Sequence, residues 1–372
     1  MARELTITQL DDAINQPLTN PECGLLATTE ESERQFDELM ESAVSIRTLG
    51  VGDSKDNLAT DARILKCDDD FLQALTTLGK YNEALWQPKA GKPTCCSWHW
   101  IVAEEDREQQ FLQNRLVISQ GSVGSCAGHA AHNAVQLSKL TRRAFGIKSN
   151  YVSMNRIATW YASKGNSMSG GQILSYMMEY MCYMGLFPES LVGNSISTAP
   201  TKYKDYRNEA KEYQSYVVPI PWGTTDSVAN IILLAAKAGF NTFVGNTMWP
   251  TSKTAQTNGV AKPVFSSGGG HATMVGDWRP ATVNKTGFRF QEAVFFGNSH
   301  GDKYTAKSES KEPKYGCWLN RDQIKTYLST AKGFGSPAIF IPEVTLLQDK
   351  PLQLDLDILY KYVVPDGLEM VG

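Results

Sequence analysis

A glycine-rich segment carries a thiol directly before a stretch with helical periodicity. Gln120-Gly121-Ser122-Val123-Gly124-Ser125-Cys126 is followed at once by apolar residues at the spacing of one helix face. A thiol is a strong nucleophile only as a thiolate. The start of a helix stabilises that anion through its unpaired backbone N–H groups and the positive end of its dipole. We therefore expect Cys126 to act as a nucleophile toward a carbonyl group.

The same segment contains a hydrogen-bond donor suited to that reaction. Gln120 stands six residues before Cys126. Its side-chain amide can donate to a developing oxyanion, beside the backbone N–H of Cys126. Gly121 and Gly124 would let the backbone turn tightly next to the thiol and leave room for a substrate. The expected oxyanion hole thus combines Gln120 with the backbone of Cys126.

Three ordered motifs resemble those of papain-like cysteine peptidases. The family's active-site cysteine lies in a segment similar to the one around Cys126, with a histidine and an asparagine far downstream. Gly270-His271-Ala272 resembles the family's histidine strand, and Gly297-Asn298-Ser299 resembles its asparagine segment. His271 follows the cysteine by 145 residues, within the family's range, whereas Asn298 follows it by 172, which is longer. The resemblance covers roughly residues 112–342.

The resemblance implies a role for each of these residues. His271 would be the general base and Asn298 would orient its ring, in an acyl transfer that needs no metal or organic cofactor. Gly170 and Gly171 would offer backbone hydrogen bonds to an extended peptide. The chain is therefore expected to be a cysteine-type peptidase, a thiol protease of the bacterial or phage type, with a polypeptide substrate.

The residues around Cys126 leave two further readings open. His129 lies about one turn beyond the thiol and could be the base, but its side chain would lean along the same helix face, so we expect a core residue. A metal site formed by Cys126, His129 and His132 is the other reading, although no fourth ligand stands at metal-binding spacing.

Val123 occupies the position where secreted family members usually have a disulfide-forming cysteine.

Composition excludes several classes of protein. The chain has 372 residues, 42% of them apolar and 20% charged, with a net charge of −3, which is typical of a soluble globular protein. No basic cluster indicates nucleic acid, and no apolar run is long enough to span a bilayer. The cysteine count is seven, and only Cys95 and Cys96 lie close together. This favours free thiols and a reducing, cytoplasmic location.

The periodicity predicts helices before strands. Helices are expected over 28–46 (with a capping box from Thr28 and Glu31), 69–80, 125–142, 172–184 and 226–238, and strands over 240–244, 272–275, 288–296 and 338–341. This order is typical of an α+β protein. The resemblance makes it a papain-like two-lobe fold, with Cys126 on a helical lobe, His271 and Asn298 on a β-rich lobe, and an appended N-terminal region.

The chain divides into three expected regions. These are an N-terminal accessory region (1–110), a peptidase domain (111–342) and a C-terminal tail (343–372), with a turn-rich segment at 88–93 before the first boundary. The tail is too apolar for a free solvated end. The alternative function is therefore a structural or assembly protein of a larger particle, such as a virion, with ancillary or dormant activity. Protein partners would then bind residues 1–110 and 343–372.

Overall fold

A computed structural model describes twelve segments of the chain. They are residues 25–46, 63–85, 120, 123–144, 154–164, 170–193, 206–250, 255–257, 260–262, 265–283, 289–299 and 316–342. The expectations for the tail (343–372) and for Cys95 and Cys96 lie outside these residues. Within the described segments, no helix combines the length and the apolar character needed to cross a membrane.

A six-stranded sheet in the order β11-β10-β7-β4-β12-β3 forms the centre of the fold. All its neighbouring strands are antiparallel. Its strands are β3 (Tyr216–Pro219), β4 (Asn241–Pro250), β7 (Phe265–Arg279), β10 (Ala293–Gly297), β11 (Gly316–Leu319) and β12 (Ala338–Ile341). Three two-stranded pairs complete the described strands: β1 (Met154–Asn155) with β2 (Phe187–Pro188), β5 (Ala255–Thr257) with β6 (Val260–Lys262), and β8 (Thr282–Val283) with β9 (Arg289–Phe290).

The sheet is apolar on both faces. In β12, Ala338 and Phe340 belong to one hydrophobic cluster, whereas Ile339 and Ile341 belong to another. Successive side chains of a strand point to opposite faces, so an unbroken apolar run requires cover on both sides. The sheet must therefore lie between two layers of helices.

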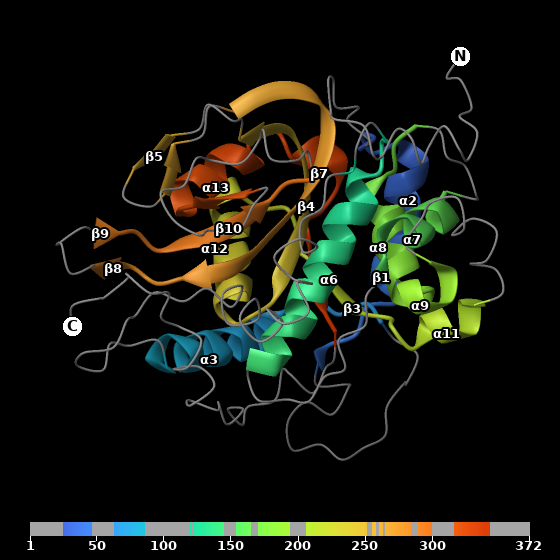
Figure 1. Ribbon diagram of the computed structural model, residues 1–372, viewed down its shortest axis with the longest axis horizontal. Helices are drawn as coiled ribbons and strands as arrows, with labels where there is room; N and C mark the ends of the chain where they lie inside the picture. The colour runs from blue at the N-terminus through green and yellow to red at the C-terminus, as the bar shows by residue number, and fades with distance from the viewer. Residues whose placement is uncertain are drawn as a thin grey trace.

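Helices supply that cover. α12 (Thr225–Lys237) packs on one face with α3 (Asp69–Leu85) and α13 (Arg321–Leu328), and α6 (Cys126–Ala144) packs on the other with α8 (Leu174–Tyr183). The remaining helices are α2 (Glu30–Glu41), α7 (Arg156–Ser163), α9 (Glu189–Val192), α11 (Arg207–Lys211) and the 3-10 turn η5 (Lys332–Phe334). In Figure 1, α6 runs between the strands on the left and the group α2, α7, α8, α9 and α11 on the right. The predicted α+β fold, with a helical lobe and a β-rich lobe, is confirmed.

Two segments from the first 110 residues belong to the same cores. The Leu65 N–H donates to the Val217 carbonyl at 2.9 Å, and the Val44 N–H donates to Ile64 at 3.1 Å. Phe71, on α3, is fully buried in the cluster beneath the sheet. These segments extend β3 and cover α12. The boundary near residue 110 remains a prediction, because residues 86–119 are outside the described segments.

The predicted capping box at the first helix is displaced by one residue. α2 begins at Glu30, and the Thr29 hydroxyl accepts the Ser32 N–H at 3.2 Å while the Ser32 hydroxyl accepts the Thr29 N–H at 2.8 Å. The expected Thr28–Glu31 box is therefore wrong. The Thr28 backbone N–H instead donates to Gly333 at 3.0 Å, which holds this residue outside the helix.

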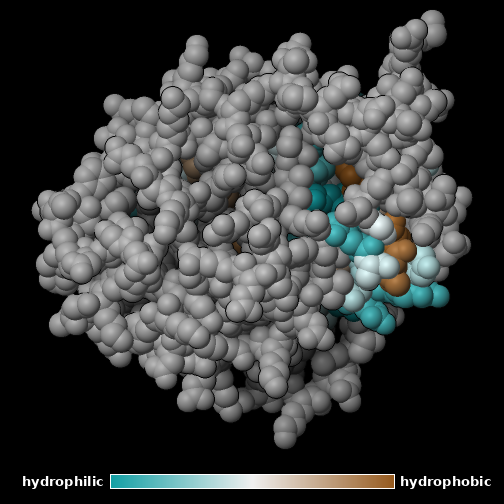
Figure 2. Space-filling model, viewed as in Figure 1, coloured by the Kyte–Doolittle hydropathy of each residue, from teal (hydrophilic) through white to brown (hydrophobic). Residues whose placement is uncertain are grey.

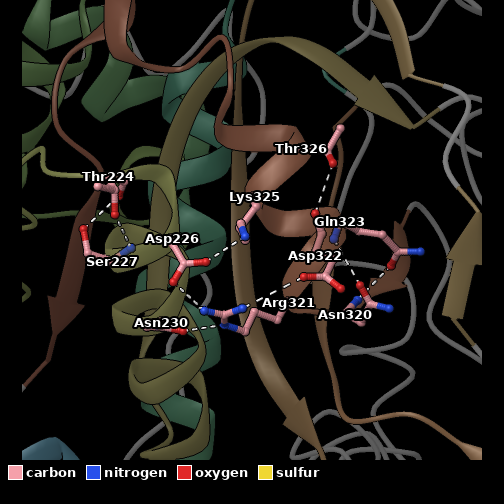
Figure 3. A network of polar contacts seen from close by, with 10 residues as sticks. All are labelled: Thr224, Asp226, Ser227, Asn230, Asn320, Arg321, Asp322, Gln323, Lys325 and Thr326. Atoms are coloured by element: carbon pink, nitrogen blue, oxygen red, sulfur yellow. Dashed lines mark hydrogen bonds and ion pairs between the residues drawn. The ribbon is translucent and has the colours of Figure 1, made fainter.

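Charged side chains join α12 to α13 at the surface (Figure 3). Arg321 contacts Asp226 at 2.5 Å, and Lys325 contacts the other oxygen of this carboxylate at 2.7 Å. These bonds lower the pKa of Asp226, with the Lys325 hydrogen bond as the largest cause. Because all three side chains are partly exposed, the network contributes little to stability. Figure 2 shows polar and apolar residues mixed on the described surface at the right of this view.

Candidate active site

Cys126 is the first residue of α6. The Ser125 carbonyl accepts the His129 N–H at 3.1 Å, which is the first bond of the helix and makes Ser125 its cap. The helix approaches α7 closely two residues later, because a Cβ at Gly128 would collide with Trp160. The thiol is therefore fixed at a helix start inside the protein, where the positive end of the helix dipole favours a thiolate.

His271 and Asn298 meet through their side chains. His271 lies in β7 and Asn298 directly follows β10, the antiparallel neighbour of β7. His271 Nε2 is 3.0 Å from Asn298 Oδ1. Since an amide oxygen only accepts, the neutral ring carries its hydrogen on Nε2 and its lone pair on Nδ1. This tautomer leaves Nδ1 as the basic nitrogen.

The thiol lies beside the histidine strand. The Ala272 backbone N–H donates to Cys126 Sγ at 3.4 Å, and Ala272 is the residue that follows His271. α6 packs directly on β7 and β4, so the contact is part of the main interface between helix and sheet. The fold thus brings Cys126 against Ala272, which is 146 residues away in sequence and directly follows His271.

Gln120 joins the thiol segment to the asparagine segment. Its Nε2 donates to the Val123 carbonyl at 2.8 Å, and its Oε1 accepts the Ser299 hydroxyl at 2.5 Å. The Gln120 backbone N–H also donates to the Ser299 carbonyl at 2.8 Å. Ser299 therefore orients the Gln120 amide, a contact that the sequence pattern did not indicate. The Gln120 nitrogen carries two hydrogens, so its bond to Val123 is compatible with a second acceptor.

All four side chains are buried. Cys126 and Gln120 are 0% exposed, and His271 and Asn298 are 1% exposed. Burial lowers the pKa of His271 from its ordinary 6.5 to about 4, although the Asn298 hydrogen bond opposes this shift. The imidazole is consequently neutral at pH 7 in this covered state and can accept a proton.

The glycine loop lies at the edge of the helical lobe. Gly170 is exposed with φ of +70°, and its carbonyl accepts Lys164 Nζ at 2.7 Å. Gly171 is buried. The carbonyl of the next residue, Gln172, accepts the Leu26 N–H at 2.9 Å. Substrate binding by Gly170 and Gly171 remains a prediction, and the sequence did not single out Gln172.

His129 and His132 are buried in α6. His129 Nδ1 lies 3.2 Å from the Ser125 hydroxyl and 3.0 Å from its carbonyl, so the ring is directed back along its own helix. Burial lowers the pKa of His129 to about 3 and that of His132 well below its ordinary value. No group of three or more potential metal ligands is arranged to hold an ion in the described part of the chain.

Two of the other described thiols have raised pKa values. Cys67, Cys126, Cys182 and Cys317 are free cysteines. Burial and, to a lesser extent, Asp68 raise the pKa of Cys67 to about 11. Burial also raises the pKa of Cys182 strongly. These two thiols are held in their protonated, unreactive form.

No family model and no curated protein matches the sequence. Among solved structures, the fold is similar to xylellain, a cysteine protease from Xylella fastidiosa, at 14% identity over 61% of this chain and 82% of that chain, with a TM-score of 0.42. It is similar to the bromelain protease from Ananas comosus at 12% identity, over 68% and 100% of the two chains, with a TM-score of 0.39. The proform of Amb a 11, a ragweed pollen cysteine protease, matches at 14% identity over 85% and 90%, also at 0.39. These TM-scores are below 0.5, so the assignment of function rests on the site itself.

Proposed function

We propose that the protein is a papain-like cysteine peptidase in which Cys126 is the nucleophile and His271 the base. The observation that carries the proposal is the position of His271. Its Nε2 is held by Asn298 at 3.0 Å, while the N–H of the next residue contacts Cys126 Sγ at 3.4 Å. Three segments that are distant in sequence thus provide a thiol, a base and an orienting amide at one place.

The proposed reaction is acyl transfer. His271 Nδ1 takes the thiol proton, and the Cys126 thiolate attacks the carbonyl carbon of a peptide bond. Gln120 Nε2 and the Cys126 backbone N–H donate to the resulting oxyanion. The tetrahedral intermediate collapses, the C–N bond breaks, and the amine leaves with the proton from His271. Water, deprotonated by His271, then hydrolyses the thioester and regenerates the thiol.

Labelling with an epoxide-type thiol inhibitor tests the nucleophile. The full chain should gain one inhibitor mass on Cys126, and Cys126→Ala should gain none. Cys182→Ala is the matched control, because Cys182 is equally buried but its Sγ contacts the Arg63 carbonyl at 3.8 Å. Labelling that persists in Cys126→Ala and disappears in Cys182→Ala would overturn the assignment.

Hydrolysis of a fluorogenic peptide library tests the reaction class. Cys126→Ala and His271→Ala should each abolish turnover. A protein whose peptide hydrolysis survives both substitutions is not a cysteine peptidase of this mechanism. The assembly role, with its partners on residues 1–110 and 343–372 and its location in a virion, remains a prediction from the sequence.

A further inference from the structure

The carbonyl of Ser125 accepts two hydrogen bonds from one residue, His129. The His129 backbone N–H donates to it at 3.1 Å, as in the first turn of any α-helix. The ring of His129 adds a second contact, since its Nδ1 lies 3.0 Å from the same oxygen and 3.2 Å from the Ser125 hydroxyl. The helix requires only the first of these bonds, so the second is an additional constraint on this carbonyl.

These contacts define which ring nitrogen of His129 carries the hydrogen. A carbonyl oxygen only accepts hydrogen bonds, so Nδ1 must be the protonated nitrogen. The ring has a single hydrogen, because burial and, to a lesser extent, the charge of Arg156 lower the pKa of His129 to about 3. At pH 7, His129 is therefore a neutral donor through Nδ1, whereas His271 donates to Asn298 through Nε2.

The Ser125 carbonyl belongs to the same peptide unit as the Cys126 N–H. Resonance couples the two ends of this planar amide. A hydrogen bond that the oxygen accepts therefore polarises the amide and makes its N–H a stronger donor. In the proposed reaction, this N–H donates to the oxyanion. His129 thus binds one end of the amide whose other end would stabilise the oxyanion.

The Val123 carbonyl connects this peptide unit to the second proposed donor. It accepts the Ser125 N–H at 2.8 Å and Gln120 Nε2 at 2.8 Å. Ser125 is 0% exposed and is held on both sides, through its N–H by Val123 and through its carbonyl by His129. Both expected oxyanion donors are therefore fixed by one buried set of hydrogen bonds, as electrostatic preorganisation requires.

We propose that His129 is a positioning residue of the oxyanion hole, whose Nδ1–H fixes and polarises the Ser125–Cys126 peptide unit and so strengthens the Cys126 N–H as a donor to the oxyanion. This inference rests on the proposed peptidase function. His129 acts through the backbone and does not touch the substrate. Its effect adds to that of the helix start, which any residue at position 129 would leave in place.

Peptide hydrolysis by the full-length chain tests the effect on the reaction. His129→Leu removes the donor but keeps a buried side chain. It should lower kcat by about 10-fold, less than the 10²- to 10³-fold typical of losing an oxyanion donor itself, with little change in KM. His129→Asn should recover most of this loss, because its amide nitrogen can take the place of Nδ1.

His132→Leu is the matched control for these variants. His132 is equally buried in the same helix, but its Nδ1 lies 3.4 Å from Asn133 Oδ1 and has no printed role at Ser125 in the described contacts. This variant should retain the wild-type kcat. If His129→Leu does not fold, as judged by thermal unfolding, His129→Gln replaces it, because its amide lies one carbon farther from the backbone than Nδ1.

A spectroscopic measurement detects the hydrogen bond without relying on catalysis. The ¹⁵N chemical shift of the Cys126 amide responds to hydrogen bonding at the preceding carbonyl. Labelling with ¹⁵N-cysteine restricts the spectrum to the seven cysteines, and the signal that Cys126→Ala removes is that of Cys126. This signal should move in His129→Leu, return toward its wild-type position in His129→Asn, and stay in place in His132→Leu.

The two measurements separate this inference from the proposed function. If Cys126→Ala abolishes hydrolysis but His129→Leu keeps the wild-type kcat, the peptidase assignment is supported and the role of His129 is overturned. Equal losses of kcat in His129→Leu and His132→Leu would also overturn it, since packing would then be the cause. If hydrolysis survives Cys126→Ala, the peptidase assignment falls. The Cys126 ¹⁵N shift then decides whether His129 polarises the peptide unit, and an unmoved signal in His129→Leu would show that it does not.

Discussion

His271 Nε2 lies 3.0 Å from Asn298 Oδ1, a contact between two adjacent antiparallel strands that ties the imidazole to the end of β10. The sheet register creates this contact, since Gly297 pairs with Met274 three residues beyond His271. The orientation of the proposed base therefore depends on the stability of the strand pair as well as on the Asn298 side chain.

Asn298→Ala should lower kcat for peptide hydrolysis by about 10²-fold, the typical cost of misplacing a reacting group. The imidazole loses the hydrogen bond that Asn298 accepts from it, so its ring can rotate away from the thiol. KM should change little, because Asn298 does not bind the substrate. Asn230→Ala is the control. Asn230 lies at the surface, where its side-chain oxygen accepts a hydrogen bond from Arg321. Equal kcat values for the two variants would contradict the orienting role.

Gln120→Ala should lower kcat by about 10²- to 10³-fold with little change in KM, as expected for an oxyanion donor. Ser299→Ala should have a smaller effect in the same direction, because Ser299 acts only by holding the Gln120 amide. Steady-state kinetics on one peptide substrate measure both. A larger loss for Ser299→Ala than for Gln120→Ala would show that the hydroxyl, rather than the amide, is the important group.

The free energy of unfolding should fall as the pH falls below 6.5. Burial lowers the pKa of His129 to about 3 and that of His271 to about 4, so both rings are neutral in the folded protein. In the unfolded chain both histidines have their ordinary pKa of 6.5. At pH values between these lowered pKa values and 6.5, the unfolded chain therefore binds more protons than the folded protein. Acid therefore favours unfolding in that window.

Denaturant titrations at successive pH values measure this dependence. His129→Gln retains a polar side chain beside Ser125 but removes one titrating group. The slope of its free energy of unfolding against pH should be smaller than that of the wild type by the equivalent of about one bound proton. A slope identical to that of the wild type would show that His129 does not contribute.

Gly276→Ala should destabilise the protein by about 1–3 kcal/mol, the usual cost of overpacking. A Cβ at this position in β7 would collide with the Asn241 side chain. Asn241 Nδ2 donates to the Ser138 hydroxyl of α6 at 2.9 Å, so the collision would also strain the contact between sheet and helix. Gly333→Ala is the control, because a Cβ there has no neighbour within 4 Å. Similar unfolding midpoints for both variants would contradict this packing argument.

Local signals predicted much of the site-bearing structure. The strand 338–341 was predicted to its observed bounds, because Pro337 and Pro342 enclose an apolar run. The start of α6 was predicted to within one residue from the preceding glycines and the apolar periodicity. These features are encoded by neighbouring residues, so one sequence is sufficient to locate them.

Contacts set by distant pairing could not be predicted. β7 was expected over 272–275 but spans Phe265–Arg279, since pairing with β4 overrides the low strand propensity of Gly268–Gly270. The bonds of Leu25 to Gly270 and of Leu26 to Gln172 depend on how three remote segments align in space. No local pattern specifies that alignment. The one-residue displacement of the first capping box also results from a distant contact, the hydrogen bond from the Thr28 N–H to Gly333.

The position of residues 25–28 in the chain has a consequence for protein synthesis. Leu25 leaves the ribosome well before Cys126, and Cys126 leaves it well before His271 and Asn298. Residues 25–28 are thus already available when the last strands of the sheet are made. The contacts of Leu25 with Gly270 and of Leu26 with Gln172 are therefore completed only when the strand that carries Gly270 has left the ribosome, so this early segment joins the two lobes at the end of folding.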